Sequence, residues 1–286
     1  MSERIVRVFP RKTMATPDDM LAFVGPPPTG RFESNWNGPA FNEVHISVAF
    51  TEDKPIAEGL AEEWGHITET VKIGGPAYDD PGGDFIPGRY LKRGYVITSR
   101  GCPNNCWFCK VPHREGRKMR ELPIAKGWNV LDSNLLACSR GHITSVFEML
   151  KQQSKRARFT GGLEAARLED WHVGLLWDLR PDMMFFAYDT PDDLEPLVEA
   201  GKMLCRANFT RRHLRCYVLI GTPMDTIGSA RARLMSAWDA GFLPMAMLWS
   251  GKRGQVQSKE WKTLQREWAR PAITKSVVKN LLYGNR

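Results

Sequence analysis

Three cysteines crowd into one short stretch of the chain and could hold a metal centre. Cys102, Cys106 and Cys109 have the spacing Cys-x3-Cys-x2-Cys. Gly101 and Pro103 help the backbone to turn there, so three thiolates on one irregular loop can converge on a single cluster. A fourth nearby cysteine is missing, and one iron of a bound iron–sulfur cluster would therefore stay open to a further ligand.

The alternative is a structural zinc site. His113 lies just beyond Cys109, and three cysteines with one histidine are an ordinary ligand set for zinc. The position of the cysteine loop favours the cluster, because the loop follows a predicted strand at the start of a regular α/β pattern.

That pattern must position the loop and its partners. From residue 95 onward, apolar β-favouring runs alternate with segments of helical spacing, and parallel strands need such crossover connections. The expected strands are residues 95–98, 129–131, 157–160, 183–187, 215–220 and 244–248, and the clearest helices are residues 142–153, 192–204 and 226–240. Six repeats predict a partial (β/α)6 barrel with functional groups at the carboxyl ends of its strands.

The amino-terminal part reads differently. Short apolar runs at residues 4–9, 44–50 and 71–73 are separated by turn-rich segments, which predicts a small α/β extension. We therefore expect an extension over residues 1–90, of reduced Rossmann-like form, and the barrel over residues 91–286 with a carboxyl-terminal helical segment.

Composition fits a protein of the cytoplasm. The 286 residues are 42% hydrophobic, enough for a large core, but no run approaches the roughly 18 apolar residues of a membrane span. The start lacks the pattern of a secretory signal, so we expect no membrane association. The six cysteines do not form a secreted disulfide framework, and Cys138, Cys205 and Cys216 are expected to be buried packing residues.

The cysteine loop resembles the signature of radical S-adenosylmethionine (SAM) enzymes, including the aromatic Phe108 before the third cysteine. The resemblance implies a [4Fe–4S] cluster on Cys102, Cys106 and Cys109, with SAM chelating the open iron. It further implies reductive cleavage of SAM to methionine and a 5′-deoxyadenosyl radical, which abstracts hydrogen from a substrate. An electron donor such as a flavodoxin or ferredoxin is implied as a partner.

The run RFTGGLEAARL resembles the glycine-rich strand end of that family, where the backbone receives the SAM amino group. Gly161 and Gly162 lack a Cβ and so allow close approach by a ligand. The family's acidic residue directly follows the glycines, whereas Leu163 intervenes here before Glu164. Glu164 is a candidate cofactor contact with that departure noted.

Two further strand ends carry candidates. FFAYDT offers Tyr188 and Asp189 to the ribose or the substrate, as candidate catalytic residues; the alternative is that Asp189 or Thr190 caps the next helix.

YVLIGTPMDT resembles the strand that passes near adenine, with Ile220 and Gly221 as contacts. Asp225 is expected to be a helix N-cap. Met245, or Met247, on the last strand could cover the adenine, although buried methionines are more often core residues.

The cysteine loop also resembles that of tRNA methylthiotransferases, but the amino-terminal cysteines of those enzymes are missing here. VKIGGPAYDD resembles a glycine-rich segment of cobalamin-type Rossmann domains, without their Asp-x-His-x-x-Gly motif. Over residues 44–270 the chain looks most like compact, largely uncharacterised radical SAM proteins of bacteria and their phages.

Charge points to a substrate class. Forty Lys and Arg against thirty-two Asp and Glu give +8. Basic stretches occupy residues 114–120, which could line the barrel mouth, 151–158, expected to be a solvated surface, and 211–215. We expect a nucleic-acid base or modified nucleotide as substrate. The alternatives are a peptide or small metabolite, and a non-catalytic Cys3His zinc module that binds nucleic acid.

Overall fold

The computed structural model describes residues 5–28, 41–78, 85–86, 88–249 and 257–283. The chain forms two compact units, Met1–Gly127 and Trp128–Arg286. The division therefore falls beyond the cysteine loop and not near residue 90, where the composition changes. One cause is that the loop region packs with the first unit: the Arg114 guanidinium donates to the carbonyl of Ala49 at 3.5 Å.

The first unit is built on a four-stranded parallel sheet in the order β2-β1-β3-β4. Its strands are β1 (Ile5–Phe9), β2 (Ala22–Val24), β3 (Glu43–Ser47) and β4 (Val71–Gly74). The runs at residues 4–9, 44–50 and 71–73 are thus confirmed as strands. The order is that of flavodoxin-like doubly wound sheets, which agrees with the expected α/β extension.

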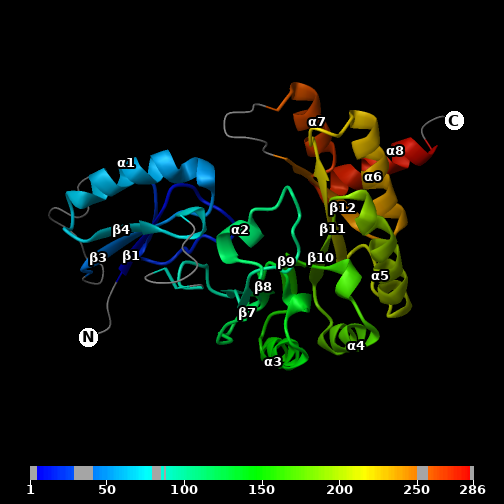
Figure 1. Cartoon of the computed structure of the whole chain (residues 1–286), viewed down its shortest axis with the longest axis horizontal. Helices are drawn as coiled ribbons and strands as arrows, with labels where there is room; N and C mark the ends of the chain where they lie inside the picture. Colours follow the sequence, from blue (N-terminus) through cyan, green and yellow to red (C-terminus); the bar gives the residue numbers. More distant parts are fainter. Residues whose placement is uncertain (1–4, 29–40, 79–84, 87, 250–256, 284–286) are drawn as a thin grey trace. The chain divides into compact units, whose positions relative to one another are not determined.

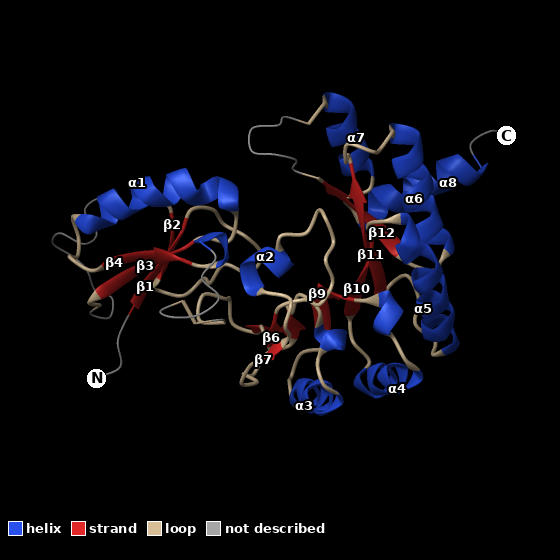
Figure 2. Cartoon of the chain, in the orientation of Figure 1, coloured by secondary structure: helices blue, strands red, loops and turns tan. Residues whose placement is uncertain are grey.

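Helix α1 (Lys54–Gly65) connects β3 to β4 and lies along one face of this sheet (Figure 2). Alternate strand residues point to that face, including Val6, Val44 and Ile46, and they are fully buried with Trp64 of the helix. This cluster is the core of the first unit.

A series of short elements completes the first unit. They are β5 (Tyr95–Val96), β6 (Ser99–Arg100), α2 (Val111–Glu115) and β7 (Arg120–Glu121). Strands β6 and β7 pair antiparallel, with Ser99 opposite Glu121. The cysteine loop, residues 101–110, therefore leaves from one strand of a short hairpin and returns through α2.

The second unit is a series of parallel strands that follow one another both in sequence and in space. Within it the strands lie in the order β12-β11-β10-β9-β8. They are β8 (Asn129–Val130), β9 (Arg158–Leu163), β10 (Met183–Tyr188), β11 (Leu214–Ile220) and β12 (Leu243–Leu248). All of these neighbours pair parallel.

Helices connect these strands. They are α3 (Arg140–Lys151), α4 (Asp170–Leu179), α5 (Leu194–Arg206) and α6 (Ile227–Asp239), followed by α7 (Lys259–Glu267) and α8 (Pro271–Tyr283). Crossovers between parallel strands are right-handed, so a series in sequence order places α3 to α6 on the same face of the sheet, as Figure 1 shows. The α/β class is confirmed; the partial (β/α)6 barrel stays a prediction.

Helix predictions were right for three segments and incomplete elsewhere. Residues 142–153, 192–204 and 226–240 correspond to α3, α5 and α6, whereas α4 was not expected. Of the helices described, none is long and apolar enough to cross a membrane.

Candidate functional site

The three cysteines lie on one loop between β6 and α2. Cys102 is buried, whereas Cys106 and Cys109 are half-buried. The amide of Cys109 donates to the carbonyl of Cys106 at 3.0 Å, which makes a tight turn between them. Phe108 is half-buried and its ring meets the edge of the exposed Trp107 at 5.5 Å.

Glu115 clamps the base of the loop. Its buried carboxylate accepts from the amide of Gly101 at 3.1 Å and from the guanidinium of Arg100 at 3.0 Å. The amide of Cys102 also donates to the carbonyl of Gly116 at 3.2 Å. Gly101 has φ +92°, and a Cβ there would lie 2.4 Å from the carbonyl oxygen of Lys118, so only glycine fits. The loop therefore starts and ends at fixed points.

Arginines of the basic stretch at residues 114–120 serve this loop region. The guanidinium of Arg117 donates to the carbonyl of Pro103 at 3.3 Å, and that of Arg120 to the carbonyl of Glu115 at 3.4 Å. These side chains satisfy backbone carbonyls of an irregular segment, a role that the sequence did not suggest.

The donor set suits a cluster by its chemistry. Three thiols within eight residues, on a loop with anchored ends, match the requirement of an iron–sulfur centre that keeps one iron open. Within the described ranges, no group of three or more His, Cys, Asp or Glu side chains is arranged to hold a metal ion. The fit is thus one of donor type and spacing. His113, the fourth ligand of the zinc alternative, is exposed on α2.

Of the remaining cysteines, Cys216 is fully buried on β11, and burial raises the pKa of its thiol. Cys205 is exposed near the end of α5, so the expectation that it would be a buried packing residue was wrong. An amphipathic helix carries some apolar residues on its outer face, and spacing alone did not place Cys205 there.

The glycine pair at the end of β9 divides into two roles. A Cβ on Gly161 would lie 2.3 Å from the carbonyl oxygen of Asp132 and 2.4 Å from the carbonyl carbon of Leu131, so Gly161 permits the close approach of two chain segments. Gly162 has φ +118°, and its Cβ would meet nothing within 4 Å. A ligand needs open space beside the backbone that it approaches, so Gly162 is the better candidate of the two for a ligand contact.

Glu164 follows this strand end and is already engaged. Its carboxylate accepts from the Asn134 amide at 2.6 Å and pairs with Arg167 at 2.5 Å. These contacts connect the segments that follow β8 and β9.

One face of the second unit's sheet carries a row of side chains across three strands. Ala187, Tyr217 and Met245 are paired neighbours in register on β10, β11 and β12. Helices α3 to α6 lie on the opposite face. Tyr217 stacks on Phe185 at 4.2 Å, and its hydroxyl donates to the carbonyl of Thr160 at 3.2 Å. We call this face, lined by Phe185, Ala187, Tyr217, Leu219, Met245 and Met247, the open face.

Alternation along β10 separates the two catalytic candidates. Tyr188 is buried and points to the same side of β10 as Met184 and Phe186, which is the side of the helices. Its side chain is therefore not presented on the open face. Asp189 continues the series of Phe185 and Ala187 and therefore belongs to the open face. Of these two candidates, Asp189 is the one at the carboxyl edge of that face.

Asp189 lies in an environment that disfavours its charge. Its carboxylate accepts one hydrogen bond, from the amide of Leu219 at 3.1 Å. Burial, reinforced by the nearby Asp193 carboxylate, raises the pKa of Asp189 to about 7. The alternative of helix capping is confirmed for Thr190, which is the N-cap of the 3-10 turn Pro191–Asp193. Asp193 completes this capping box, because its carboxylate accepts from the amides of Thr190 and Asp189 at 2.7 and 2.9 Å. Asp189 can therefore hold or release a proton near neutral pH.

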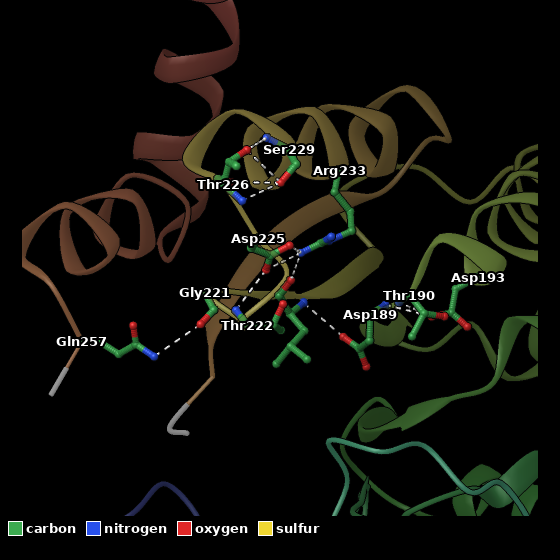
Figure 3. Close-up of polar contacts among 11 residues, drawn as sticks. Asp189, Thr190, Asp193, Gly221, Thr222, Asp225, Thr226, Ser229, Arg233 and Gln257 are labelled. Carbon is green, nitrogen blue, oxygen red and sulfur yellow. Dashed lines mark hydrogen bonds and ion pairs between the residues drawn. The ribbon is translucent and has the colours of Figure 1, made fainter. Parts of the chain in front are cut away.

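Arg233 of α6 fixes the adjacent strand end (Figure 3). Its guanidinium donates to the carbonyl of Leu219 at 2.6 Å and to the carboxylate of Asp225 at 2.9 Å. Asp225 also accepts from the amide of Thr222 at 3.1 Å. Thr226, and not Asp225 as expected, is the N-cap of α6. Arg233 thus holds the segment whose Leu219 amide binds Asp189.

The predicted adenine contacts are placed unevenly. Ile220 is fully buried, so its side chain is closed to a ligand, whereas Met245 is half-buried on the open face. Gly221 has φ +76°, and its carbonyl accepts from the Gln257 amide at 3.4 Å.

Three residues of this site were not among the candidates predicted from the sequence: Tyr217, Arg233 and Asp193. Alternation along β11 offered a signal for Tyr217 alone.

No protein-family model matches this chain, and no curated protein matches its sequence. The residues themselves therefore carry the functional interpretation.

Replacing Glu115 with Gln should weaken the clamp. Gln keeps one neutral acceptor oxygen and has a donor NH2 group in place of the other, so either the Gly101 amide or the Arg100 guanidinium loses its acceptor. The free energy of unfolding should fall by about 1–3 kcal/mol. Denaturant titration measures this. Glu121→Gln, at an exposed position of β7, is the matched control; equal effects of the two substitutions would contradict the clamp.

Replacing Gly161 with Ala should destabilise the second unit by about 1–3 kcal/mol, because the new methyl group must displace the backbone at Leu131 and Asp132. Thermal unfolding tests it, with Gly174→Ala on α4, where a Cβ meets nothing within 4 Å, as the control. An unchanged midpoint for Gly161→Ala would contradict the close approach.

Replacing Asp189 with Asn should stabilise the fold in a pH-dependent way. The folded carboxyl has a pKa of about 7 and the unfolded one 3.8, so ionisation disfavours the folded state increasingly as pH rises through that window. Relative to the original chain, Asp189→Asn should gain on the order of 2–4 kcal/mol between about pH 4 and about pH 8. Unfolding titrations across this range, with the exposed Asp192→Asn as control, test it; a constant difference contradicts the raised pKa.

Proposed function

We propose that this chain is a radical SAM enzyme. Cys102, Cys106 and Cys109 would hold a [4Fe–4S] cluster, and SAM would bind at its open iron. The observation that carries the proposal is the spacing of three thiols on a loop whose base is clamped by Glu115. The parallel strands of the second unit, which follow one another in sequence order, are consistent with it.

When bound, the cluster would supply the electron that splits SAM into methionine and a 5′-deoxyadenosyl radical. A donor such as a flavodoxin or ferredoxin would deliver that electron. The chain's own residues then bind and orient the reactants. Gly162 offers open space for a polar group of SAM at the end of β9, and Met245 offers apolar surface on the open face.

Asp189 is the residue we assign to proton handling. Its carboxyl has a pKa of about 7 and stands at the carboxyl edge of the open face. A group with that pKa can bind a hydroxyl or amine of the substrate in its ionised form, or donate a hydrogen bond in its protonated form. Arg233 is a positioning residue, because it acts on Asp189 only through the Leu219 segment.

The substrate class that we favour is a nucleic-acid base or a modified nucleotide. Half-buried Tyr217, stacked on the buried Phe185, lies in one row with Ala187 and Met245, and flat apolar surfaces suit nucleobases. Mass spectrometry of the reaction products would identify the base.

Anaerobic reconstitution tests the proposal. The purified chain should bind about four irons and four sulfides per molecule, and with SAM and dithionite it should release 5′-deoxyadenosine. Replacing Cys102, Cys106 or Cys109 with Ala should abolish this release, because each thiolate holds one iron. Chromatography of 5′-deoxyadenosine measures the outcome.

Cys205→Ala, at the exposed cysteine of α5, is the control and should retain full activity. Undiminished 5′-deoxyadenosine from any of the three loop variants would contradict the assignment. A colourless protein that retains zinc through Cys102, Cys106, Cys109 and His113 would replace the enzyme with the zinc-binding alternative.

A further inference from the structure

Three tryptophans in the second unit each hold a stacked cation at the same edge of the sheet. Lys155 lies 4.3 Å from the ring of Trp128, Arg180 3.3 Å from Trp177, and Arg211 4.3 Å from Trp238. Every one of these residues lies at or next to a turn that enters a strand. They therefore gather at the amino-terminal edge of the parallel sheet, opposite to Asp189.

These turns are strongly basic. Residues 152–158, 180–182 and 207–215 carry seven cations and one carboxylate, Asp182. The cations, which we call the basic edge, are Lys155, Arg156, Arg158, Arg180, Arg211, Arg212 and Arg215. All but Arg211 and Arg215 are exposed, and only Arg158 pairs with Asp182.

Hydrogen bonds join the turns into one surface. The Arg156 guanidinium donates twice to the carbonyl of Arg180, at 2.8 and 3.0 Å. The Arg215 guanidinium donates to the carbonyl of Arg211 at 3.3 Å, and the Arg211 guanidinium donates to the carbonyl of Trp238 at 2.6 Å. Segments far apart in sequence thus present their charges together.

The pKa of His213 is affected by the positive charge gathered at this edge. Burial lowers the pKa of His213, and repulsion from Arg156, Arg212 and Arg215 lowers it further, against the attraction of Asp182. Cations from two different turns therefore act on one imidazole. Helix carboxyl-terminal ends favour some positive charge, but the surplus here is spread over three turns and exceeds one cation for each helix end.

We propose that the basic edge is a docking surface for the phosphate backbone of nucleic acid. Arginine forks match phosphate oxygens, and a guanidinium that is stacked on an aromatic ring keeps its outward N–H groups for a ligand. Trp177 is 40% exposed, and its ring offers a platform for a base. As a site of substrate capture the surface rests on the proposed function; binding itself needs neither cluster nor SAM.

The basic edge can be tested with the full chain by fluorescence anisotropy. The probe is a labelled single-stranded RNA of about 20 nucleotides, titrated over a range of sodium chloride. The edge variant combines Lys155→Gln, Arg180→Asn and Arg212→Gln; Asn suits the left-handed backbone of Arg180, at φ 51°. We expect binding at least about tenfold weaker, and a slope of log affinity against log salt reduced by about 2, since each lost contact contributes about 0.7.

The matched control combines Lys259→Gln, Lys275→Gln and Lys279→Gln, which removes the same charge from exposed positions of α7 and α8. It should bind like the original chain. The proposal is overturned if the original chain does not bind the RNA in a salt-dependent way, or if both triple variants lose affinity equally. It is also overturned if the chain binds anionic phospholipid vesicles in a parallel assay but not the RNA. Release of 5′-deoxyadenosine is scored separately, so its loss would not be mistaken for loss of the surface.

Discussion

The hand of the crossover connection is the constraint on which the second unit depends. The connection between two parallel strands through a helix is right-handed. Four such connections follow one another from β8 to β12. The helices must then gather on one face, and the other face is left to the row of Tyr217 and its neighbours. The same constraint makes the two edges of the sheet unlike: turns that leave strands carry Asp189, and turns that enter strands carry the basic edge.

Each unit solves a different problem. The first unit anchors an irregular cysteine loop, for which Glu115, Gly101 and the arginines of residues 114–120 satisfy the backbone. The second unit offers a rigid strand edge, on which Arg233 fixes the chain beside Asp189. A rigid support for polar groups at strand ends is a common arrangement in α/β enzymes.

Periodicity predicted the regular parts of this protein well. The apolar runs became β1, β3, β4 and the longer strands of the second unit, because a buried parallel strand must be apolar on both faces. Side-chain direction was harder: Tyr188 and Asp189 were paired as candidates, although neighbours on a strand point to opposite faces. Contacts between distant segments were beyond reach, since no local pattern shows that Arg156 binds the carbonyl of Arg180 or that Cys205 is exposed.

The dipeptide at the end of β9 also bears on how relatives of this chain should be compared. Position 161 is a spacer between two chain segments, and any larger residue there must be accompanied by a shift of the segment after β8. At position 162 the backbone has φ +118°, which residues with a side chain rarely adopt, so a substitution there strains the chain even though its Cβ would meet no neighbour. A homologue that keeps glycine at 161 alone would therefore preserve the spacing of these segments but would need another backbone conformation at 162.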